Sequence, residues 1–141
     1  MSDSRDQEVT LEKAWAAVCG LCIQSKFHNN IPIKTVGELF LPPLRLGQFR
    51  IWEDEQGPSG FVVWAYLSKD VANKYKEGHS IQPHQWQSGK ELWFINFVSR
   101  RGSLKDKIRS LYNIFPNHKI GHILRQKTGR VGKFERIQNV E

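Results

Sequence analysis

Residues 92–99, LWFINFVS, decide how we expect the chain to fold, because six large apolar side chains surround a single amide. Branched and aromatic residues favour extended backbone. A short apolar run that does not alternate with polar residues is typical of a strand buried on both faces. We therefore predict a strand in the middle of a sheet, with Asn96 as the polar group within it.

The segment upstream of this strand has the pattern of a β-hairpin. Residues 48–53 and 61–67 are rich in strand-forming side chains, and residues 56–60 between them are the turn-forming sequence QGPSG. A short polar helix is predicted over residues 68–76, with Ser68 as its N-cap. The following stretch, up to Lys90, is expected to be a loop.

Two helices are predicted before the hairpin. Apolar residues recur at three- and four-residue steps over residues 9–23, with Thr10 in position to cap the helix. A shorter helix is predicted over residues 35–40. It should end before Pro42, because proline disfavours helical geometry in the residue that precedes it.

Downstream of the central strand, residues 104–115 have the spacing of an amphipathic helix that Pro116 ends. Strands are predicted over residues 120–125 and 131–137. The element order predicts an α+β fold in which helices flank a sheet with a hairpin at each end. We expect a single domain over residues 1–141, of which residues 1–8 are flexible.

The formal net charge of +7 predicts acidic partners such as nucleic acid, an anionic membrane or a small acidic protein. No apolar run approaches the roughly 20 residues that a membrane span needs. The first residues are polar and lack the apolar core of a signal peptide, so we expect a cytoplasmic protein.

Cys19 and Cys22 are too few for a disulfide framework. Their spacing resembles that of thioredoxins, but the pair falls inside the first predicted helix, and a zinc site would need a second ligand pair. We predict neither a metal site nor a redox role. Serine at both positions should leave function intact.

A basic chain with five tryptophans and eight phenylalanines also suggests a nucleic-acid-binding domain. No known nucleic-acid-binding motif is recognisable in the sequence, and we therefore predict no nucleic-acid partner. Binding driven by phosphate contacts would weaken steeply with added salt, which distinguishes this alternative.

Several segments together resemble the RTX toxin-activating lysine acyltransferases of the HlyC/RtxC type. SKFH at residues 25–28, followed by Ile31-Pro32, is similar to that family's Ser-Pro-Leu-His and Trp-Pro. WAYLS at residues 64–68 is similar to Ser-Trp-Ala-Asn-Leu, and WQSGKELWFINF at residues 86–97 to Trp-Thr-Ser-Gly and Trp-Phe-Ile-Asp-Trp. Phe115-Pro116 and Val131-Gly132-Lys133 match in order and approximate spacing, so the resemblance covers nearly the whole chain.

The resemblance implies a GNAT-like fold with a central, mostly antiparallel twisted sheet. It implies transfer of a fatty acyl group from acyl-acyl carrier protein to internal lysines of an RTX protoxin, with no bound cofactor. The implied partners are acyl carrier protein and the protoxin. A homodimer and a transient association with membranes remain open.

His28 occupies the position of the family's catalytic histidine, and Asn96 that of its catalytic aspartate. An amide oxygen can orient an imidazole but cannot supply the negative charge of a carboxylate. We expect His28 to act as general base, oriented by Asn96. The alternative is a weak or inactive member that binds the toxin without turnover. Ser25 matches a family serine and is either a nucleophile or the end of the first helix.

In GNAT-like folds a phosphate of the donor lies at the start of the helix that follows a central strand. We therefore predict that the segment Arg100, Arg101, Gly102 and Ser103 binds the acyl donor, unless it is an ordinary capped turn. Side chains proposed for the acyl-chain groove are Trp64, Trp86, Trp93 and Phe94. Basic residues that could dock the acidic carrier protein are Lys105, Lys107, Arg109, Lys119, Arg125, Lys127, Arg130 and Lys133.

Overall fold

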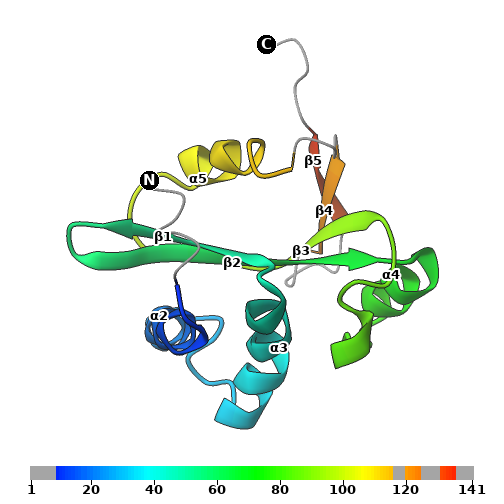
Figure 1. Cartoon of the computed structure of the whole chain (residues 1–141), viewed down its shortest axis with the longest axis horizontal. Helices are drawn as coiled ribbons and strands as arrows, with labels where there is room; N and C mark the ends of the chain where they lie inside the picture. Colours follow the sequence, from blue (N-terminus) through cyan, green and yellow to red (C-terminus); the bar gives the residue numbers. More distant parts are fainter. Residues whose placement is uncertain (1–8, 116–119, 125–130, 136–141) are drawn as a thin grey trace.

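The computed structural model describes residues 9–115, 120–124 and 131–135 (Figure 1). The predictions for residues 1–8, 125 and 136–137 lie outside the described residues. The helices are α2 (Leu11–Ile23), α3 (Ile33–Leu46), α4 (Lys69–Lys76) and α5 (Leu104–Leu111), with a 3-10 turn η1 (Pro83–Gln85). The strands are β1 (Phe49–Asp54), β2 (Gly57–Leu67), β3 (Glu91–Ser99), β4 (Ile120–Leu124) and β5 (Val131–Glu135).

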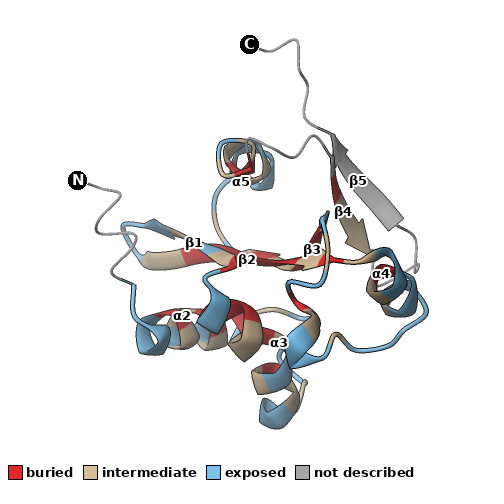
Figure 2. Cartoon of the chain, turned by 45° about the vertical axis from the view of Figure 1, so that its right-hand side comes forward, coloured by how far each residue is buried: buried red, intermediate tan, exposed pale blue. Residues whose placement is uncertain are grey.

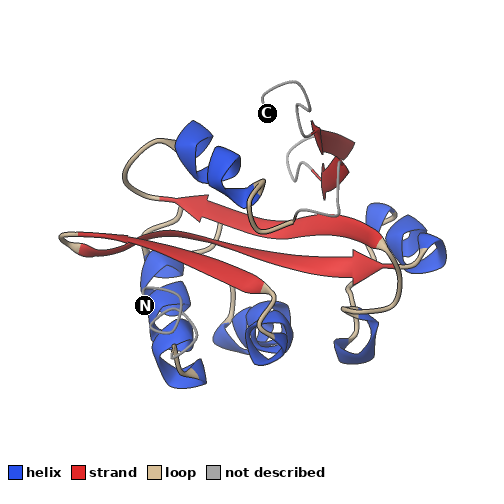
Figure 3. Cartoon of the chain, turned by 45° about the horizontal axis from the view of Figure 1, so that its top comes forward, coloured by secondary structure: helices blue, strands red, loops and turns tan. Residues whose placement is uncertain are grey.

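The strands form one sheet in the order β1-β2-β3-β4-β5. Neighbouring strands are antiparallel except for β3 and β4, which are parallel. Hairpins lie at both ends of this order, and β3 lies at its centre, as predicted. The α+β prediction is confirmed, and the mostly antiparallel sheet with its flanking helices is compatible with a GNAT-like fold (Figure 3).

Helices cover both faces of the sheet (Figure 2). On one face, which we call the helix-pair face, α2 and α3 bury the larger core. On the other face, α5 covers a second, smaller core. The side chains of β2 alternate between the two cores: Phe61, Val63, Ala65 and Leu67 belong to the first, and Val62 and Trp64 to the second.

Helix α3 is longer than the sequence predicted, because it runs through Pro42 and Pro43 to Leu46. Proline has no amide hydrogen to donate within a helix, which disfavours this arrangement. Burial outweighs that cost here: Phe40, Pro43 and Leu44 are all buried on one side of the helix. The helix ends at Leu46 and is capped by Gly47, whose φ of 72° suits glycine.

The first hairpin is also tighter than predicted. Strand β2 begins at Gly57, which pairs with Asp54, so that only two residues connect the strands. A register shift between Trp52 and Glu53 accommodates this turn. Helix α5 ends at Leu111, earlier than the predicted Phe115.

No helix in the described part of the chain is long and apolar enough to cross a membrane.

Candidate functional site

His28 is held by the compact turn that follows α2. The amide of Ser25 donates to the carbonyl of Cys22 at 3.0 Å, and the amide of His28 donates to the carbonyl of Ser25 at 3.0 Å. The His28 ring packs near the fully buried Phe40 of α3, with ring centroids 6.2 Å apart. The turn therefore fixes the imidazole between α2, α3 and the sheet.

Both ring nitrogens of His28 have a side-chain partner. Nδ1 lies 2.7 Å from Ser25 Oγ, and Nε2 lies 2.9 Å from Asn96 Oδ1. A carbonyl oxygen only accepts, so Nε2 must carry the hydrogen that this contact uses. In the neutral imidazole Nδ1 is then the acceptor and receives the hydroxyl hydrogen of Ser25. We call this chain of three side chains the Ser25–His28–Asn96 relay.

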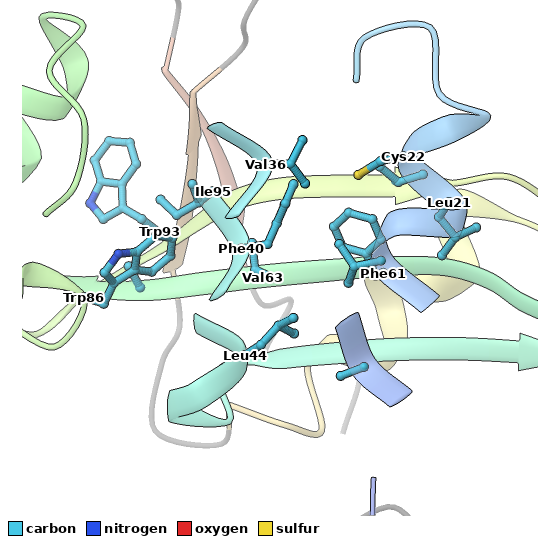
Figure 4. Packing of buried hydrophobic residues seen from close by; sticks show 14 of the residues in the cluster. Leu21, Cys22, Val36, Phe40, Leu44, Phe61, Val63, Trp86, Trp93 and Ile95 are labelled. Carbon is cyan, nitrogen blue, oxygen red and sulfur yellow. The ribbon is translucent and has the colours of Figure 1, made fainter. Parts of the chain in front are cut away.

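Asn96 reaches His28 because β3 contains a bulge. Val63 of β2 pairs with Asn96, whereas its neighbour Trp64 pairs with Phe94, which leaves Ile95 without a partner in β2. Ile95 belongs to the core of the helix-pair face, among Trp93, Phe40 and Val63 (Figure 4). Asn96, bonded to His28, projects to that same face. The bulge thus places two consecutive side chains on one side of the sheet.

The relay is half-buried, which suits acid–base chemistry. A base oriented by a third group and bonded to a hydroxyl is the arrangement that activates nucleophiles in hydrolases and transferases. The sequence predicted His28, Asn96 and Ser25 as residues of the catalytic site, and hydrogen bonds join all three in the structure. Phe40 was not predicted to support the ring, and an apolar residue within a helix gives no sequence signal for such a role.

The predicted donor-binding segment has mostly structural contacts. The guanidinium of Arg101 binds both carboxylate oxygens of Asp54, at 2.7 and 2.8 Å, and the carbonyls of Gly57 and Pro58. These hydrogen bonds from Arg101 lower the pKa of the Asp54 carboxyl to about 2. Arg101 therefore ties the first hairpin to the end of β3.

The other members of this segment lie around the start of α5. Ser103 caps the helix by accepting from the amide of Asp106 at 3.1 Å, and Gly102 has a φ of 82°. Arg100 is exposed. Of the basic residues proposed for docking, Lys107 does not fit, because it is buried and donates to the carbonyl of Arg101. Lys119, Arg125, Lys127 and Arg130 lie outside the described residues.

The aromatic residues proposed for an acyl groove do not share one surface. Trp86 and Trp93 are buried in the core of the helix-pair face, and Trp64 and Phe94 in the core beneath α5. Trp64 packs edge-on against Phe115 with centroids 4.8 Å apart. All four are packed as core residues in the structure.

The WQSG segment, residues 86–89, packs against the C-terminal end of β2. Ser88 Oγ accepts from the amide of Ser68 at 3.1 Å, and Gly89 packs directly against the backbone of residues 67 and 68. Gln48, a buried polar residue that the sequence did not single out, donates to the carbonyls of Trp64 and Trp86.

A hollow of about 680 Å³ lies at the opposite end of the helix pair from His28. Its lining contains no histidine, cysteine, serine or carboxylate, so it does not hold the chemistry of the relay. The lining residues are Val9, Thr10, Leu11, Leu44, Arg45, Gly47, Phe49, Arg50 and Ile51.

The two cysteines lie on α2 as free thiols. Burial is the main cause that raises the pKa of Cys22, to about 11, and burial also raises that of Cys19. Both thiols therefore stay protonated at neutral pH, which is unfavourable for redox or metal chemistry. No group of three or more metal-ligating side chains is present among the residues described.

Known proteins that resemble the chain share one activity in their names. A leukotoxin-activating lysine-acyltransferase LktC from Pasteurella haemolytica-like sp. (strain 5943B) is 28% identical over 114 residues, covering 80% of this chain and 69% of the relative. The RTX-I toxin-activating lysine-acyltransferase ApxIC of Actinobacillus pleuropneumoniae is 28% identical over 127 residues, covering 89% and 71%. A protein-lysine myristoyltransferase HlyC of Escherichia coli is 26% identical over 117 residues, covering 82% and 69%.

The family model described as the HlyC RTX toxin acyltransferase family matches residues 7–141. This match includes all three members of the relay. The chain therefore belongs to the RTX toxin acyltransferase family.

Proposed function

We propose that this protein transfers a fatty acyl group from acyl-acyl carrier protein to internal lysine side chains of an RTX protoxin and thereby activates it. The names of its relatives support the reaction class and the toxin partner. The observation that carries the mechanism is the Ser25–His28–Asn96 relay, in which an oriented imidazole has its accepting nitrogen at a half-buried surface.

The acceptor amine must lose its proton to react. A free lysine has a pKa near 10.4, so only about one in a thousand is neutral at pH 7. As the neutral amine attacks the thioester carbonyl, His28 Nδ1 takes a proton from the nitrogen. The tetrahedral intermediate then collapses with cleavage of the carbon–sulfur bond. The imidazolium returns its proton to the departing thiolate, which leaves an amide and a free carrier thiol.

Asn96 has an orienting role in this mechanism. Its carbonyl oxygen holds the hydrogen on Nε2 and so keeps Nδ1 unprotonated, as an acceptor. The family's aspartate would in addition stabilise the imidazolium by charge. An asparagine retains the geometry without the charge, which is consistent with an active enzyme in which orientation is the contribution of this residue.

The position of Ser25 favours a second route to the same product. Because Ser25 Oγ lies 2.7 Å from Nδ1, His28 could deprotonate the hydroxyl and let it attack the thioester. The carrier thiol would leave with that proton, and the acyl-serine would then be aminolysed by lysine. In the direct route, Ser25 instead moves off Nδ1 or passes the amine proton on.

The two routes differ in their prediction for Ser25→Ala. The covalent route requires complete loss of transfer and a trappable ester on Ser25 in the parent enzyme. The direct route predicts retained turnover with, at most, a moderate change in rate. Mass spectrometry of the enzyme after incubation with donor alone distinguishes them, since only the covalent route adds an acyl mass to residue 25.

We propose acyl carrier protein as donor because it is strongly acidic and this chain carries a net charge of +7. The exposed Arg100 at the end of β3 is the member of the predicted donor segment with no side-chain hydrogen bond or ion pair among the described residues. Carrier protein and a newly made protoxin would meet this chain in the cytoplasm.

The decisive experiment incubates the purified protein with acyl-acyl carrier protein and a protoxin, followed by peptide mass spectrometry. We expect an acyl mass on lysine with the parent protein and with His84→Ala, a control at an exposed histidine of η1. His28→Ala should abolish it. Absence of acylation by the parent protein would favour a non-catalytic toxin partner, and full activity of His28→Ala would refute the proposed base.

A further inference from the structure

The three most exposed large hydrophobic side chains in the described part of the chain lie close together in sequence. Ile33 is 71% exposed, Ile23 is 70% exposed and Phe27 is 59% exposed, whereas the next, Leu104, is 49% exposed. Single exposed hydrophobic residues are common, so a group of them on one short segment is the feature that suggests an interaction surface. We call these three residues the apolar collar.

The collar residues flank the turn that carries His28 along the chain. Ile23 is the last residue of α2, Ile33 is the first of α3, and Phe27 precedes His28 directly. Backbone hydrogen bonds within residues 22–31 keep the turn compact. The connection lies on the helix-pair face of the molecule (Figure 1). A group that approaches His28 Nδ1 from solvent therefore meets this turn and the collar that flanks it.

The same segment has only positive charges. Residues 21–37 contain no aspartate or glutamate, and Lys26 and Lys34 are exposed. A local excess of positive charge attracts acidic groups. It also disfavours the ammonium form of an approaching lysine relative to the neutral amine that the reaction requires.

We propose that the apolar collar, with Lys26 and Lys34, binds the acceptor polypeptide and selects lysines flanked by apolar and acidic side chains. The inference depends on the proposed acyl transfer and specifies its acceptor. A polypeptide suits the collar better than an acyl chain, because its members are all more than half exposed and none of them lines the hollow at the other end of the helix pair. Apolar side chains beside the target lysine would cover the collar while acidic ones pair with the two lysines.

The test uses synthetic lysine peptides as acceptors and carrier-bound acyl donor, with initial rates followed by mass spectrometry. One peptide has apolar and acidic residues beside its lysine, a second has serine in place of the apolar residues, and a third has lysine in place of the acidic ones. The enzyme variants are Ile23→Ser and Phe27→Ser. Leu104→Ser is the matched control, since Leu104 is also exposed but begins α5 on the opposite face of the sheet.

For the first peptide we expect kcat/KM to fall about five- to thirtyfold in each collar variant. This fall should come from a higher KM. The control should stay within twofold of the parent. The collar variants should also discriminate less between the first and second peptides than the parent does, because the contact that distinguishes them is gone. The third peptide should be the poorer acceptor at low salt, and less so as salt is added.

Equal rates for all three peptides, or collar variants that match the control, would overturn the acceptor assignment. Binding of the parent but not of the collar variants to vesicles of anionic phospholipid, with unchanged peptide kinetics, would also overturn it in favour of a membrane surface. These outcomes are separate from failure of the proposed function. In that case the parent protein would acylate none of the peptides and no protoxin.

Discussion

Replacing Asn96 by leucine removes one of the two hydrogen bonds of the His28 imidazole and leaves its other contacts in place. The lost contact is the one of 2.9 Å from His28 Nε2, while Ser25 at 2.7 Å and the Phe40 ring remain. Leucine is close to asparagine in size but cannot accept a hydrogen. The Nε2 hydrogen then has no protein acceptor, and the ring is free to adopt the other tautomer.

General-base catalysis contributes about 10²–10⁴ in rate, and only part of it depends on orientation. Because two of the three contacts that hold the ring persist, we expect kcat to fall about 10- to 100-fold, with KM nearly unchanged. A net hydrogen bond contributes about 1 kcal/mol to stability. For a domain of this size, its loss corresponds to a fall in Tm of roughly 3–4 °C.

The assay measures initial rates of acyl transfer to protoxin lysine by mass spectrometry, beside thermal unfolding by circular dichroism. Asn73→Leu is the matched control, an exposed asparagine on α4 that should change neither quantity. Asn96→Asp should retain or raise the rate, since a carboxylate both orients the ring and stabilises the imidazolium. The reasoning is refuted if Asn96→Leu keeps the parental kcat, and a large loss in Asn96→Asp would mean that the amide itself is required.

Three further predictions concern the scaffold. Because Arg101 lowers the pKa of Asp54 to about 2 from 3.8, their pairing stabilises the fold above about pH 4 and this contribution is lost as pH falls towards 2; Tm measured from pH 6 to 2 should fall less steeply in Arg101→Ala than in the parent. Serine at Cys19 and Cys22 should leave acyl transfer intact, and iodoacetamide should label the raised-pKa thiols of the native parent far more slowly than those of the denatured chain. Gly89→Ala should destabilise the protein by about 2 kcal/mol or more in urea unfolding, because an added Cβ would lie 2.4 Å from backbone atoms of Ser68; an unchanged unfolding midpoint would contradict that contact.

Local hydrogen-bonding patterns were the part of the fold that the sequence predicted best. Thr10 and Ser68 were expected to cap their helices, and each accepts from the amide three residues later, at 3.1 and 3.2 Å. Ser103 does the same at the start of α5. A cap depends on the spacing of a few neighbouring residues, so it can be read without knowledge of the rest of the fold. The apolar run of β3 was as informative, because a strand that is buried on both faces has apolar residues at consecutive positions instead of alternate ones.

Features that depend on distant residues could not be predicted in this way. Helix α3 continues through two prolines because Phe40, Pro43 and Leu44 are buried against the sheet and α2. Local preference favours a break there, and only the packed core reverses it. Arg101 likewise resembled a phosphate ligand in sequence, whereas its carboxylate partner lies 47 residues away in the first hairpin.

Family resemblance predicts that Asn96 lies beside His28, whereas the alternating pattern of a regular strand predicts that Asn96 lies on the other face of the sheet. Strict alternation along β3 would send Trp93, Ile95 and Phe97 to the helix-pair face, with Asn96 beneath α5 and away from His28. The bulge changes that set to Trp93, Ile95, Asn96 and Val98, while Phe97 joins the core under α5. Asn96 and Val98 thus project to the helix-pair face in place of Phe97 and Ser99, so a polar group enters the site while apolar residues remain on either side of it. Since Ile95 and Val98 stay packed on either side of Asn96, the same irregularity that aims the amide also restrains it, and we regard the bulge as part of the site.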